Sequence, residues 1–391
     1  MLLQRTLRHL LVTNDFPPKA GGIQSYLWEL WRRIDPSSFA VLTTSSHPDA
    51  AVFDAKQRAS GMRIERVPSK FLLPTASARR RVRDAAAEIG ASLVVLDPAL
   101  PLGLVGGPLD LPYAVVLHGA ELTVPGRLPV SRAAAKKVLR GARLLICAGR
   151  YPAAEARRLI EGRPVRLVEI PPGVDTERFR PLGESERHEA RSLFGFPEDA
   201  EVVLSVSRLV PRKGMDVLIE ASAALRPSFP KLIVAIGGEG RDLHRLEHLV
   251  RRSEAPVRFL GKVPDESLPL LYGAADVFVM ACRDRWGGLE REGFGIVFLE
   301  AAASGVPQIA GCSGGSDEAV AHGESGLVVE DPSDPSRVAS SLRRLLADAD
   351  LRRRMGAAAR HRAETCFDYD LLSHRLFDAL EGVEGVGSVE G

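Results

Sequence analysis

Three cations in the segment SVSRLVPRKGMD form the first candidate group for chemistry. Arg208, Arg212 and Lys213 follow an apolar run that predicts a strand, and a helix is expected to begin at about Met215. Loops that follow the carboxyl ends of parallel strands form ligand sites. Arginine makes two-pronged hydrogen bonds to phosphate and lysine supplies a compact charge, so both can stabilise a departing diphosphate. A solvated basic loop is the alternative, and the position after the strand favours the phosphate site.

Two glutamates in CRDRWGGLEREGFGIVFLEAAASGVP form the second candidate group. Glu292 and Glu300 lie on either side of a Gly-Phe-Gly turn, and Glu300 is expected about two turns into the helix that follows. A carboxylate can accept hydrogen bonds from two neighbouring hydroxyls, such as those of a sugar. The alternative is the ordinary preference of glutamate for the start of a helix. The flanking glycines, which expose backbone amides, favour a sugar-nucleotide site.

A glycine pair near the amino terminus is a weaker candidate for phosphate binding. In VTNDFPPKAGGIQSYLWEL, Gly21 and Gly22 precede a helix that is expected to start near Ile23. Glycines let backbone amides approach a phosphate where the helix dipole favours an anion. The alternative is a plain turn. The segment lacks the G-x-G-x-x-G pattern, so a nicotinamide cofactor gains no support.

One histidine is placed where it could touch a ligand. His118 follows the predicted strand Tyr113–Leu117 and is followed by glycine. A single histidine can equally be structural or solvated. No Asp-x-Asp triad or histidine cluster accompanies it, so no metal is predicted.

The cysteines are widely spaced and include no C-x-x-C pair, which predicts neither a zinc site nor a disulfide framework; they are Cys147, Cys282, Cys312 and Cys366.

The elements that must position these residues alternate between apolar runs and segments of helical period, which predicts parallel sheets covered by helices. A first series of strands is expected at Leu7–Thr13, Ala40–Thr43, Ser92–Leu96, Tyr113–Leu117, Leu144–Ala148 and Val165–Ile170. A second series is expected at Val202–Val206, Lys231–Ile236, Val257–Leu260, Val277–Met280 and Val306–Ala310. The pattern therefore predicts two doubly wound, Rossmann-like α/β domains that face a central cleft.

The Pro- and Gly-containing segment Pro171–Phe194 is interpreted as the interdomain linker. The first domain is placed at 1–180 and the second at 181–369. A last helix, at about 370–383, is expected to pack back on the first domain. The Gly-rich segment 384–391 is expected to be a flexible tail.

Charge is unevenly distributed over the chain. Of its 391 residues, 45% are hydrophobic and 26% charged, which is typical of soluble proteins. Residues 1–180 hold 27 Lys and Arg against 16 Asp and Glu, which is +11; since the whole chain carries +2, the remainder carries −9. The basic half is expected to contact an anionic membrane surface, although a solvated helix face is the alternative. Its two basic clusters are Arg79, Arg80, Arg81 and Arg83, and Lys136, Lys137, Arg140 and Arg143.

Targeting signals are weak. The apolar run near the amino terminus is too short for a signal peptide, and no stretch approaches the roughly twenty apolar residues of a spanning helix. We therefore expect a cytoplasmic protein that is peripheral at the inner face of the cell membrane. No recognition motif or aromatic platform supports binding of nucleic acid.

The four segments that hold these candidates, taken together and in this order, resemble the family 4 glycosyltransferases of GT-B fold. Glu292 and Glu300 match the E-x7-E signature of that family. The resemblance covers nearly the whole chain and is looser from Ala120 to Ile160. Within the family, the chain is most similar to actinobacterial α-mannosyltransferases that act on phosphatidylinositol mannosides, through VTNDFPPKAGGIQSYL, PPGVDTERFRP, SRLVPRKGMD, EGFGIVFLEA and GCSGG.

The resemblance implies a role for each candidate. Arg208 and Lys213 would grip the donor pyrophosphate, and Glu300 would bind the ribose hydroxyls. Glu292 would hold the transferred sugar, and His118 would contact that sugar from the other domain. Four of these residues are therefore expected to be catalytic: His118, Arg208, Lys213 and Glu292.

The other contacts implied by the resemblance are largely with the backbone. Gly21 and Gly22 would close over the phosphates, and Lys262 with Val263 would lie where the family holds the base. The amides that would support the sugar belong to Gly293, Phe294, Gly295 and Ile296. Phe294 stands where close relatives often have leucine, and GGSDEAV replaces GG-x-P-E-x-V, which bears on the identity of the sugar.

The resemblance implies a retaining transfer of mannose from GDP-mannose, without cofactor or metal, to a phosphatidylinositol mannoside or another lipid-linked or small polyol acceptor. Front-face substitution is expected, because the family assigns Glu292, the one candidate nucleophile, to sugar binding. The alternatives are a glycosyltransferase that uses a UDP-sugar and another acceptor, a nucleotide-sugar epimerase, and a sugar-nucleotide-binding protein without catalysis.

Overall fold

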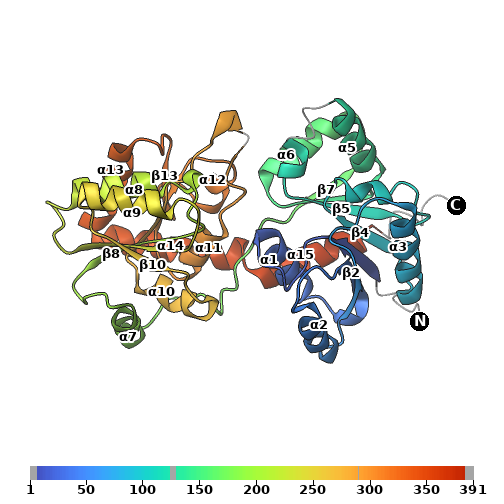
Figure 1. Ribbon diagram of the computed structural model, residues 1–391, viewed down its shortest axis with the longest axis horizontal. Coiled ribbons are helices and arrows are strands. Elements are labelled where there is room, and N and C mark those ends of the chain that lie inside the picture. The colour runs from blue at the N-terminus through green and yellow to red at the C-terminus, as the bar shows by residue number, and fades with distance from the viewer. Residues whose placement is uncertain (1–6, 124–128, 289, 384–391) are drawn as a thin grey trace. The chain divides into compact units, whose positions relative to one another are not determined.

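The computed structural model describes residues 7–123, 129–288 and 290–383 of an α/β chain (Figure 1). The chain divides into one compact unit made of residues 1–172 and 369–391, and another made of residues 173–368. The division lies before the expected boundary at 180, because the segment after Pro172 is bonded within the second unit. The Val174 amide donates to the Phe367 carbonyl at 2.8 Å, and Arg360 donates to the carbonyls of Thr176 and Phe179 at 2.9 and 2.8 Å.

The first unit is built on a parallel sheet. Its strands are β1 His9–Thr13, β2 Phe39–Thr44, β3 Arg63–Val67, β4 Leu93–Asp97, β5 Tyr113–Leu117, β6 Leu144–Cys147 and β7 Arg166–Glu169. Within the described residues, their order is β3-β2-β1-β4-β5-β6-β7, and every pairing is parallel. The central strands are buried on both faces, which explains their nearly continuous Val, Leu and Ile runs.

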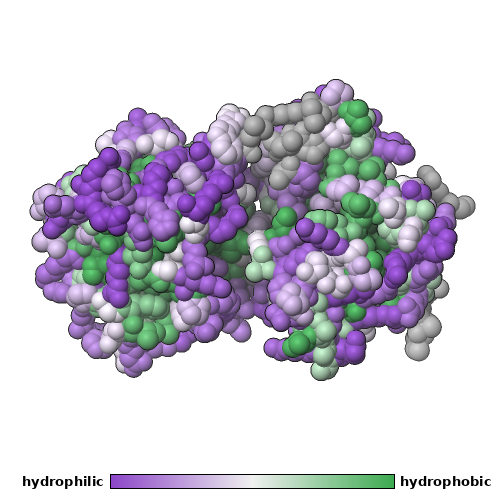
Figure 2. Space-filling view, viewed as in Figure 1, coloured by the Kyte–Doolittle hydropathy of each residue, from purple (hydrophilic) through white to green (hydrophobic). Residues whose placement is uncertain are grey.

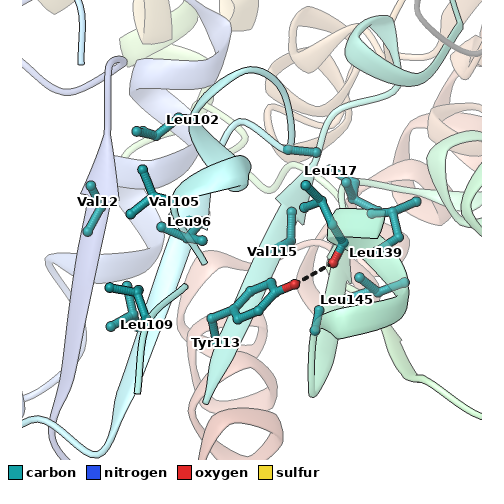
Figure 3. Packing of buried hydrophobic residues seen from close by; sticks show 14 of the residues in the cluster. Val12, Leu96, Leu102, Val105, Leu109, Tyr113, Val115, Leu117, Leu139 and Leu145 are labelled. Atoms are coloured by element: carbon teal, nitrogen blue, oxygen red, sulfur yellow. Dashed lines mark hydrogen bonds between the residues drawn. The ribbon is translucent and has the colours of Figure 1, made fainter. Parts of the chain in front are cut away.

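Helices cover both faces of this sheet. They are α1 Gly22–Trp31, α2 Ala50–Ala59, α3 Ala76–Ile89, α4 Ala120–Thr123, α5 Pro129–Gly141, α6 Arg150–Ile160 and α15 Tyr369–Glu381. On one face, α1 and α15 pack against residues such as Leu11 and Val95. On the other, α3, α5 and α6 pack against Val12, Leu96 and their neighbours (Figure 3). There the buried Tyr113 hydroxyl donates to the Val138 carbonyl at 2.7 Å.

The second unit repeats the architecture. Its strands are β8 Glu201–Val206, β9 Leu232–Gly237, β10 Val257–Gly261, β11 Val277–Met280, β12 Gln308–Gly311 and β13 Gly326–Val329. In the part of the chain that the structure describes, they form a parallel sheet in the order β10-β9-β8-β11-β12-β13. The helices are α7 Glu184–Phe194, α8 Met215–Leu225, α9 Leu243–Ser253, α10 Leu268–Ala274, α11 Ile296–Ala303, α12 Ser316–Ala319, α13 Pro335–Ala347 and α14 Ala349–Cys366. One face carries α8, α9 and α13, and the other carries α10, α11 and α14. Hydrophilic residues are interspersed with hydrophobic ones over the visible surface of both units (Figure 2).

Two features differ from the expectations, and a third expectation is not tested. The segment interpreted as linker contains the helix α7, in which Ala190 and Arg191 are buried. The helix begins after Gly183, and the Gly183 amide donates to the Glu186 side chain at 2.9 Å. The strands β3 and β13 were not predicted, because RIERV is half polar and GLVV is very short. The expected tail 384–391 lies outside the described residues.

Candidate active site

The carboxyl edge of the second sheet carries the three predicted cations. Lys213 is buried, with 7% of its surface exposed, and its Nζ donates to Glu292 Oε2 at 2.6 Å. Arg212 Nη1 donates to the same oxygen at 2.8 Å. Arg208 is exposed, and among the described residues its guanidinium has no hydrogen-bond or ion-pair partner. The structure therefore joins two of the cations to Glu292 and leaves one available to an anion.

The turn before α8 fixes the position of Lys213. Gly214 has φ of +70°, and a Cβ atom there would lie 1.9 Å from the Ala281 carbonyl oxygen. Only glycine fits this approach without a shift of the backbone. The loop after β8 thereby lies against the end of β11, from which the segment leading to Glu292 departs.

The backbone around Glu292 is held by the GCSGG segment that follows β12. The Glu292 amide donates to Ser313 Oγ at 3.1 Å, and this hydroxyl donates to Asp284 Oδ1 at 2.7 Å. The Gly315 amide donates to the Glu292 carbonyl at 3.2 Å. A Cβ at Gly314 would lie 1.9 Å from that carbonyl oxygen. A Cβ at Gly315 would lie 2.5 Å from the Gly293 carbonyl oxygen, so both glycines are explained by close contact with the backbone at Glu292 and Gly293.

Glu300 is held by a residue that sequence reasoning missed. It lies about one turn into α11 rather than two, because Gly295, with φ of +86°, delays the start of the helix to Ile296. The buried Tyr272 hydroxyl donates to Glu300 Oε2 at 2.6 Å. Burial raises the pKa of Glu300, and the hydrogen bond from Tyr272 opposes that rise. Burial also raises the pKa of Tyr272 well above 10, so the phenol remains a donor.

The amides predicted to support a sugar lie between the two glutamates. Gly293 is exposed, whereas the Phe294 side chain is buried and packs edge-on against Phe367, with 5.7 Å between ring centroids. The side chain of Phe294 therefore belongs to the core, and any contact of this residue with a ligand would come from its backbone. Gly295 caps α11, and Ile296 is its first residue.

The residues predicted to hold a base follow β10 at the same sheet edge. Lys262 is exposed and, within the described ranges, has no bonded partner. Val263 packs on the core beneath α10 and α11. Because β10, β9, β8 and β11 are consecutive neighbours in a parallel sheet, their carboxyl ends place Lys262, Arg208 and Glu292 along one edge.

In the first unit, His118 is part of a buried polar group. Its Nε2 lies 2.7 Å from Asp97 Oδ1, and Thr13 Oγ1 donates to Asp97 Oδ2 at 2.7 Å. Asp97 is fully buried and ends β4, next to β5, which delivers His118. Burial disfavours the charged imidazole, but the charge and hydrogen bond of Asp97, assisted by Glu121 and Asp15, raise the pKa of His118 above 6.5. Asp97 and Thr13 were missed, although Asp97 directly follows a predicted strand.

The predicted glycine pair lies at the start of α1. Gly22 is the first residue of the helix and Gly21 precedes it, and no side chain among the described residues caps the helix. Gln24 instead donates to Asp15 Oδ1 at 2.6 Å, and Lys19 Nζ donates to the Asn14 carbonyl at 2.9 Å. The predicted contact of this turn with phosphate stays a prediction.

Metal ligands and membrane-spanning helices bear on the class of site. Over the described residues, no group of three or more His, Cys, Asp and Glu could hold a metal ion. In the same ranges, no helix has the length and apolar character that crossing a membrane requires. The four cysteines are free; Cys147 and Cys282 are buried, and Cys312 and Cys366 are exposed.

Comparisons with known proteins show the family to which the chain belongs. Residues 186–362 match the family described as Glycosyl transferases group 1. The chain is 39% identical to the GDP-mannose-dependent alpha-(1-6)-phosphatidylinositol monomannoside mannosyltransferase of Mycobacterium tuberculosis, over 96% of this chain and 98% of that protein. It is 35% identical to the corresponding GDP-mannose-dependent mannosyltransferase for the monoacylated lipid from Corynebacterium glutamicum, over 95% of this chain and 97% of that protein.

Among solved structures, Anabaena HepE in complex with UDP matches with a TM-score of 0.80 and 21% identity, over 96% of this chain and 100% of that chain. A likeness at this identity concerns the fold. The predicted fold class, two doubly wound α/β units of GT-B type, is confirmed.

Proposed function

The chain belongs to the group 1 glycosyltransferases and is a hexosyltransferase, and from this premise we propose that it moves mannose from GDP-mannose to a phosphatidylinositol mannoside, with retention of configuration. The observation that carries the proposal is the cation group at the carboxyl edge of β8. There, Lys213 is paired with Glu292 while Arg208 has no partner among the described residues. Similarity to the mannosyltransferases named above, over nearly the whole chain, supports the choice of donor and acceptor.

The donor would bind along the edge formed by β10, β8 and β11. Arg208 would take the diphosphate, with Lys213 as the second cation. Glu300, whose orientation is set by Tyr272, would accept hydrogen bonds from the ribose hydroxyls. Lys262 and Val263 would lie beside the base. Glu292 and the amides from Gly293 to Ile296 would hold the mannose.

The pairing of Glu292 supports a route without a covalent intermediate. One of its oxygens is bound by both Lys213 and Arg212, which makes the carboxylate a weaker nucleophile. In the proposed step, the bond from the anomeric carbon to the donor phosphate oxygen breaks, and the acceptor oxygen bonds to that carbon on the same face. The acceptor proton passes to the departing phosphate oxygen, and GDP leaves. Arg208 and Lys213 would stabilise the charge that builds on the phosphate.

His118 is proposed to contact the mannose hydroxyls. Asp97 and Thr13 hold the ring in one orientation, which reduces the entropy that a ligand contact would cost. The raised pKa of His118 favours the protonated ring, in which both nitrogens are donors. One donor serves Asp97, and the other would be available to a hydroxyl oxygen.

The acceptor is proposed to be presented by an anionic membrane, at the inner face of the cell membrane. Helix α3 carries the exposed side chains of Arg80, Arg81 and Arg83. Directly before it, Phe71 and Leu73 are 56% and 53% exposed. Basic side chains beside exposed apolar ones are typical of surfaces that lie on a membrane. The second basic cluster, on and after α5, would add to this attraction.

A donor panel tests the proposal against its rivals. Purified protein is incubated with GDP-mannose or UDP-glucose, together with vesicles that contain phosphatidylinositol monomannoside, and the released nucleoside diphosphate and the lipids are measured. We expect GDP release that depends on the acceptor lipid, with mannose added to it. UDP release would point to another donor, and isomerised sugar without transfer would point to an epimerase. Binding without any turnover would indicate a protein that has lost catalysis.

A further inference from the structure

A second group of arginines lies at the other edge of the second sheet, away from Arg208 and Glu292. The residues that directly precede β11 and β12, together with the end of α11 and the start of α14, line a cavity of about 330 Å³. Its charged lining residues are Arg187, Asp276, Arg352 and Arg353. Because the sheet is parallel, this amino edge is distinct from the carboxyl edge at which the donor is proposed to bind.

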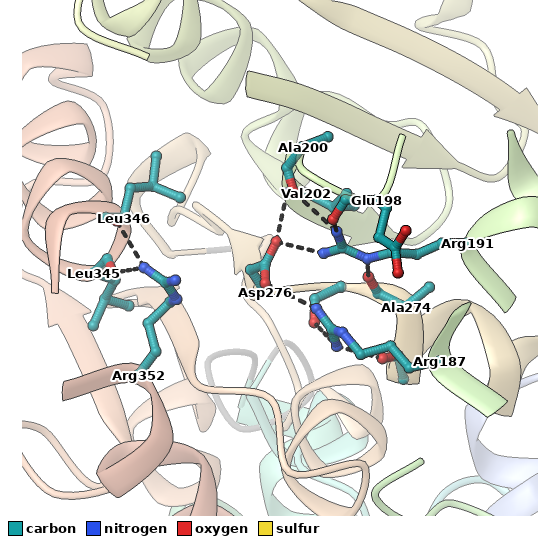
Figure 4. A network of polar contacts seen from close by, with 12 residues as sticks. Arg187, Arg191, Glu198, Ala200, Val202, Ala274, Asp276, Leu345, Leu346 and Arg352 are labelled. Atoms are coloured by element: carbon teal, nitrogen blue, oxygen red, sulfur yellow. Dashed lines mark hydrogen bonds and ion pairs between the residues drawn. The ribbon is translucent and has the colours of Figure 1, made fainter. Parts of the chain in front are cut away.

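Among the described residues that line this cavity, Asp276 is the one carboxylate, and it is already paired with arginines (Figure 4). Asp276 accepts from Arg187 through Oδ1 at 2.8 Å and from Arg191 through Oδ2 at 2.9 Å. Oδ2 also accepts from the Val202 amide at 2.7 Å. Asp276 therefore shares its single negative charge between two arginines and a backbone amide.

Arg352 has no ion pair among the described residues. Its Nη1 donates to the carbonyls of Leu345 and Leu346, at 2.7 Å each. The opposite edge of its guanidinium turns toward the side on which Arg187 and Asp276 lie (Figure 4). Arg353, by contrast, is balanced by an ion pair with Asp350.

Positive charge in this group exceeds negative charge. Burial lowers the pKa of Arg187, the nearby charges of Arg191 and Arg352 lower it further, and Asp276 opposes the change. The cations are thus close enough to repel one another. Backbone contacts nevertheless fix their positions, because Arg187 Nη1 also donates to the Gly273 and Ala275 carbonyls at 2.6 and 3.0 Å. An anion between the arginines would relieve the repulsion without moving them.

We propose that this cavity binds a phosphate group between Arg187 and Arg352. Guanidinium groups match phosphate oxygens through paired N–H donors. The cavity also reaches Ala349, the first residue of α14, but the Asp348 side chain already caps that helix by accepting from the Leu351 amide at 2.8 Å, so the arginines and not the helix dipole carry the attraction. A doubly charged anion suits two arginines that are not neutralised in full. The volume admits a phosphate ester, either a soluble one or the headgroup of a lipid.

The test measures binding of inorganic phosphate by equilibrium dialysis, in protein that carries Arg208→Gln so that the proposed donor site does not contribute. We expect one phosphate per chain in this background. Adding Arg352→Gln should weaken binding at least about tenfold, since it removes a charged hydrogen-bond donor. The matched control is Arg354→Gln, which replaces an exposed arginine of the same helix and should leave binding unchanged.

Two further arms make the result decisive. Arg352→Lys keeps the positive charge but loses the paired N–H donors, so it should bind phosphate more tightly than Arg352→Gln and more weakly than the Arg208→Gln parent. This order separates the loss of charge from a folding defect. Vesicles of phosphatidylinositol, compared with vesicles of phosphatidylcholine alone, distinguish the two sources of the phosphate group. Binding to phosphatidylinositol that needs Arg352 assigns the site to a lipid headgroup. Binding of free phosphate without binding to the vesicles assigns it to a soluble ester. The proposal is overturned if the Arg208→Gln background binds neither, or if Arg352→Gln and Arg354→Gln behave alike.

Discussion

The carboxyl edges of the two sheets hold their charges in opposite ways. In the first unit, the buried Asp97 serves one histidine and is itself braced by Thr13. In the second unit, Glu292 binds Lys213 and Arg212 through one oxygen, and the Arg208 guanidinium has no partner in the part of the chain that the structure describes. The first arrangement orients a ring. The second keeps cations close together and leaves a place for an anion, as the binding of a diphosphate requires.

The largest expected effect comes from removing the buried cation of the second edge. Lys213→Ala should lower turnover about 100- to 1,000-fold, because a charge that stabilises the leaving group is lost in a site sheltered from water. The apparent affinity for the acceptor lipid should change far less. Steady-state kinetics with the acceptor varied measure both quantities.

A control separates this effect from lost stability. Lys231→Ala removes an exposed lysine of the same unit, which pairs with Asp199, and should leave turnover unchanged. Thermal unfolding of both variants checks that they remain folded. Equal losses of turnover and acceptor affinity in Lys213→Ala would contradict its role at the leaving group.

Substitutions at the carboxyl edge of the first unit's sheet should lower activity less than Lys213→Ala does. Asp97→Asn keeps the shape of the side chain but removes the charge that raises the pKa of His118, so that pKa should fall. Activity should fall about tenfold, since a hydrogen bond between charged groups contributes roughly 1.5–3 kcal/mol. Titration of the His118 ring by NMR and kinetics at fixed pH measure the two effects.

The same substitution changes how stability depends on pH. Since the folded pKa of His118 is raised, its ion pair adds stability that is fully present below the pKa of an unfolded histidine and is lost as pH rises through the folded value. Urea unfolding across that range should therefore show a decline in the wild type that is absent in Asp97→Asn. If stability changed with pH in the same way in both proteins, the His118–Asp97 ion pair would not contribute to stability as described.

The smallest expected effect concerns Tyr272. Tyr272→Phe should raise the KM for GDP-mannose about fivefold, equivalent to roughly 1 kcal/mol for one hydrogen bond, with little change in kcat. The hydrogen bond from Tyr272 lowers the pKa of Glu300, so its loss should raise that pKa. Protonation of Glu300 weakens donor binding at low pH, and in Tyr272→Phe this weakening should begin at a higher pH than in the wild type. Donor KM measured against pH reports this shift.

Tyr113→Phe is the matched control for Tyr272→Phe. It removes another buried tyrosine hydroxyl, one that donates to the Val138 carbonyl in the first unit, and it should leave the pH profile unchanged (Figure 3). If both variants shift the profile equally, Tyr272 does not act through Glu300.

Sequence patterns predicted those strands that are buried on both faces of the sheet. The strands β5 and β11 begin and end as expected, since each is an apolar run buried on both faces. The edge strand β3 reads RIERV and is only partly buried, so its pattern resembles a loop. The helix α7 was assigned to the linker because its segment is mostly charged, although Ala190 and Arg191 are buried against the second unit.

The candidate site was predictable only for residues that lie in short motifs. Lys213 and Glu292 were both named, but their direct contact joins positions 79 residues apart. Thr13 and Asp97 are separated by 84 residues, and Tyr272 and Glu300 by 28. Buried polar side chains at the ends of apolar runs carry little local signal, because their partners are brought together by the sheet and not by the motif.

The most direct test of the central claim is the structure of the product. Purified protein would be incubated with GDP-mannose labelled with ¹³C in the sugar and with vesicles that contain phosphatidylinositol monomannoside, and NMR would define the new glycosidic bond. We predict that mannose is transferred to the lipid in α linkage, the configuration of the donor, with release of one GDP for each mannose. A β-linked product, or GDP release without mannose on the lipid, would contradict it.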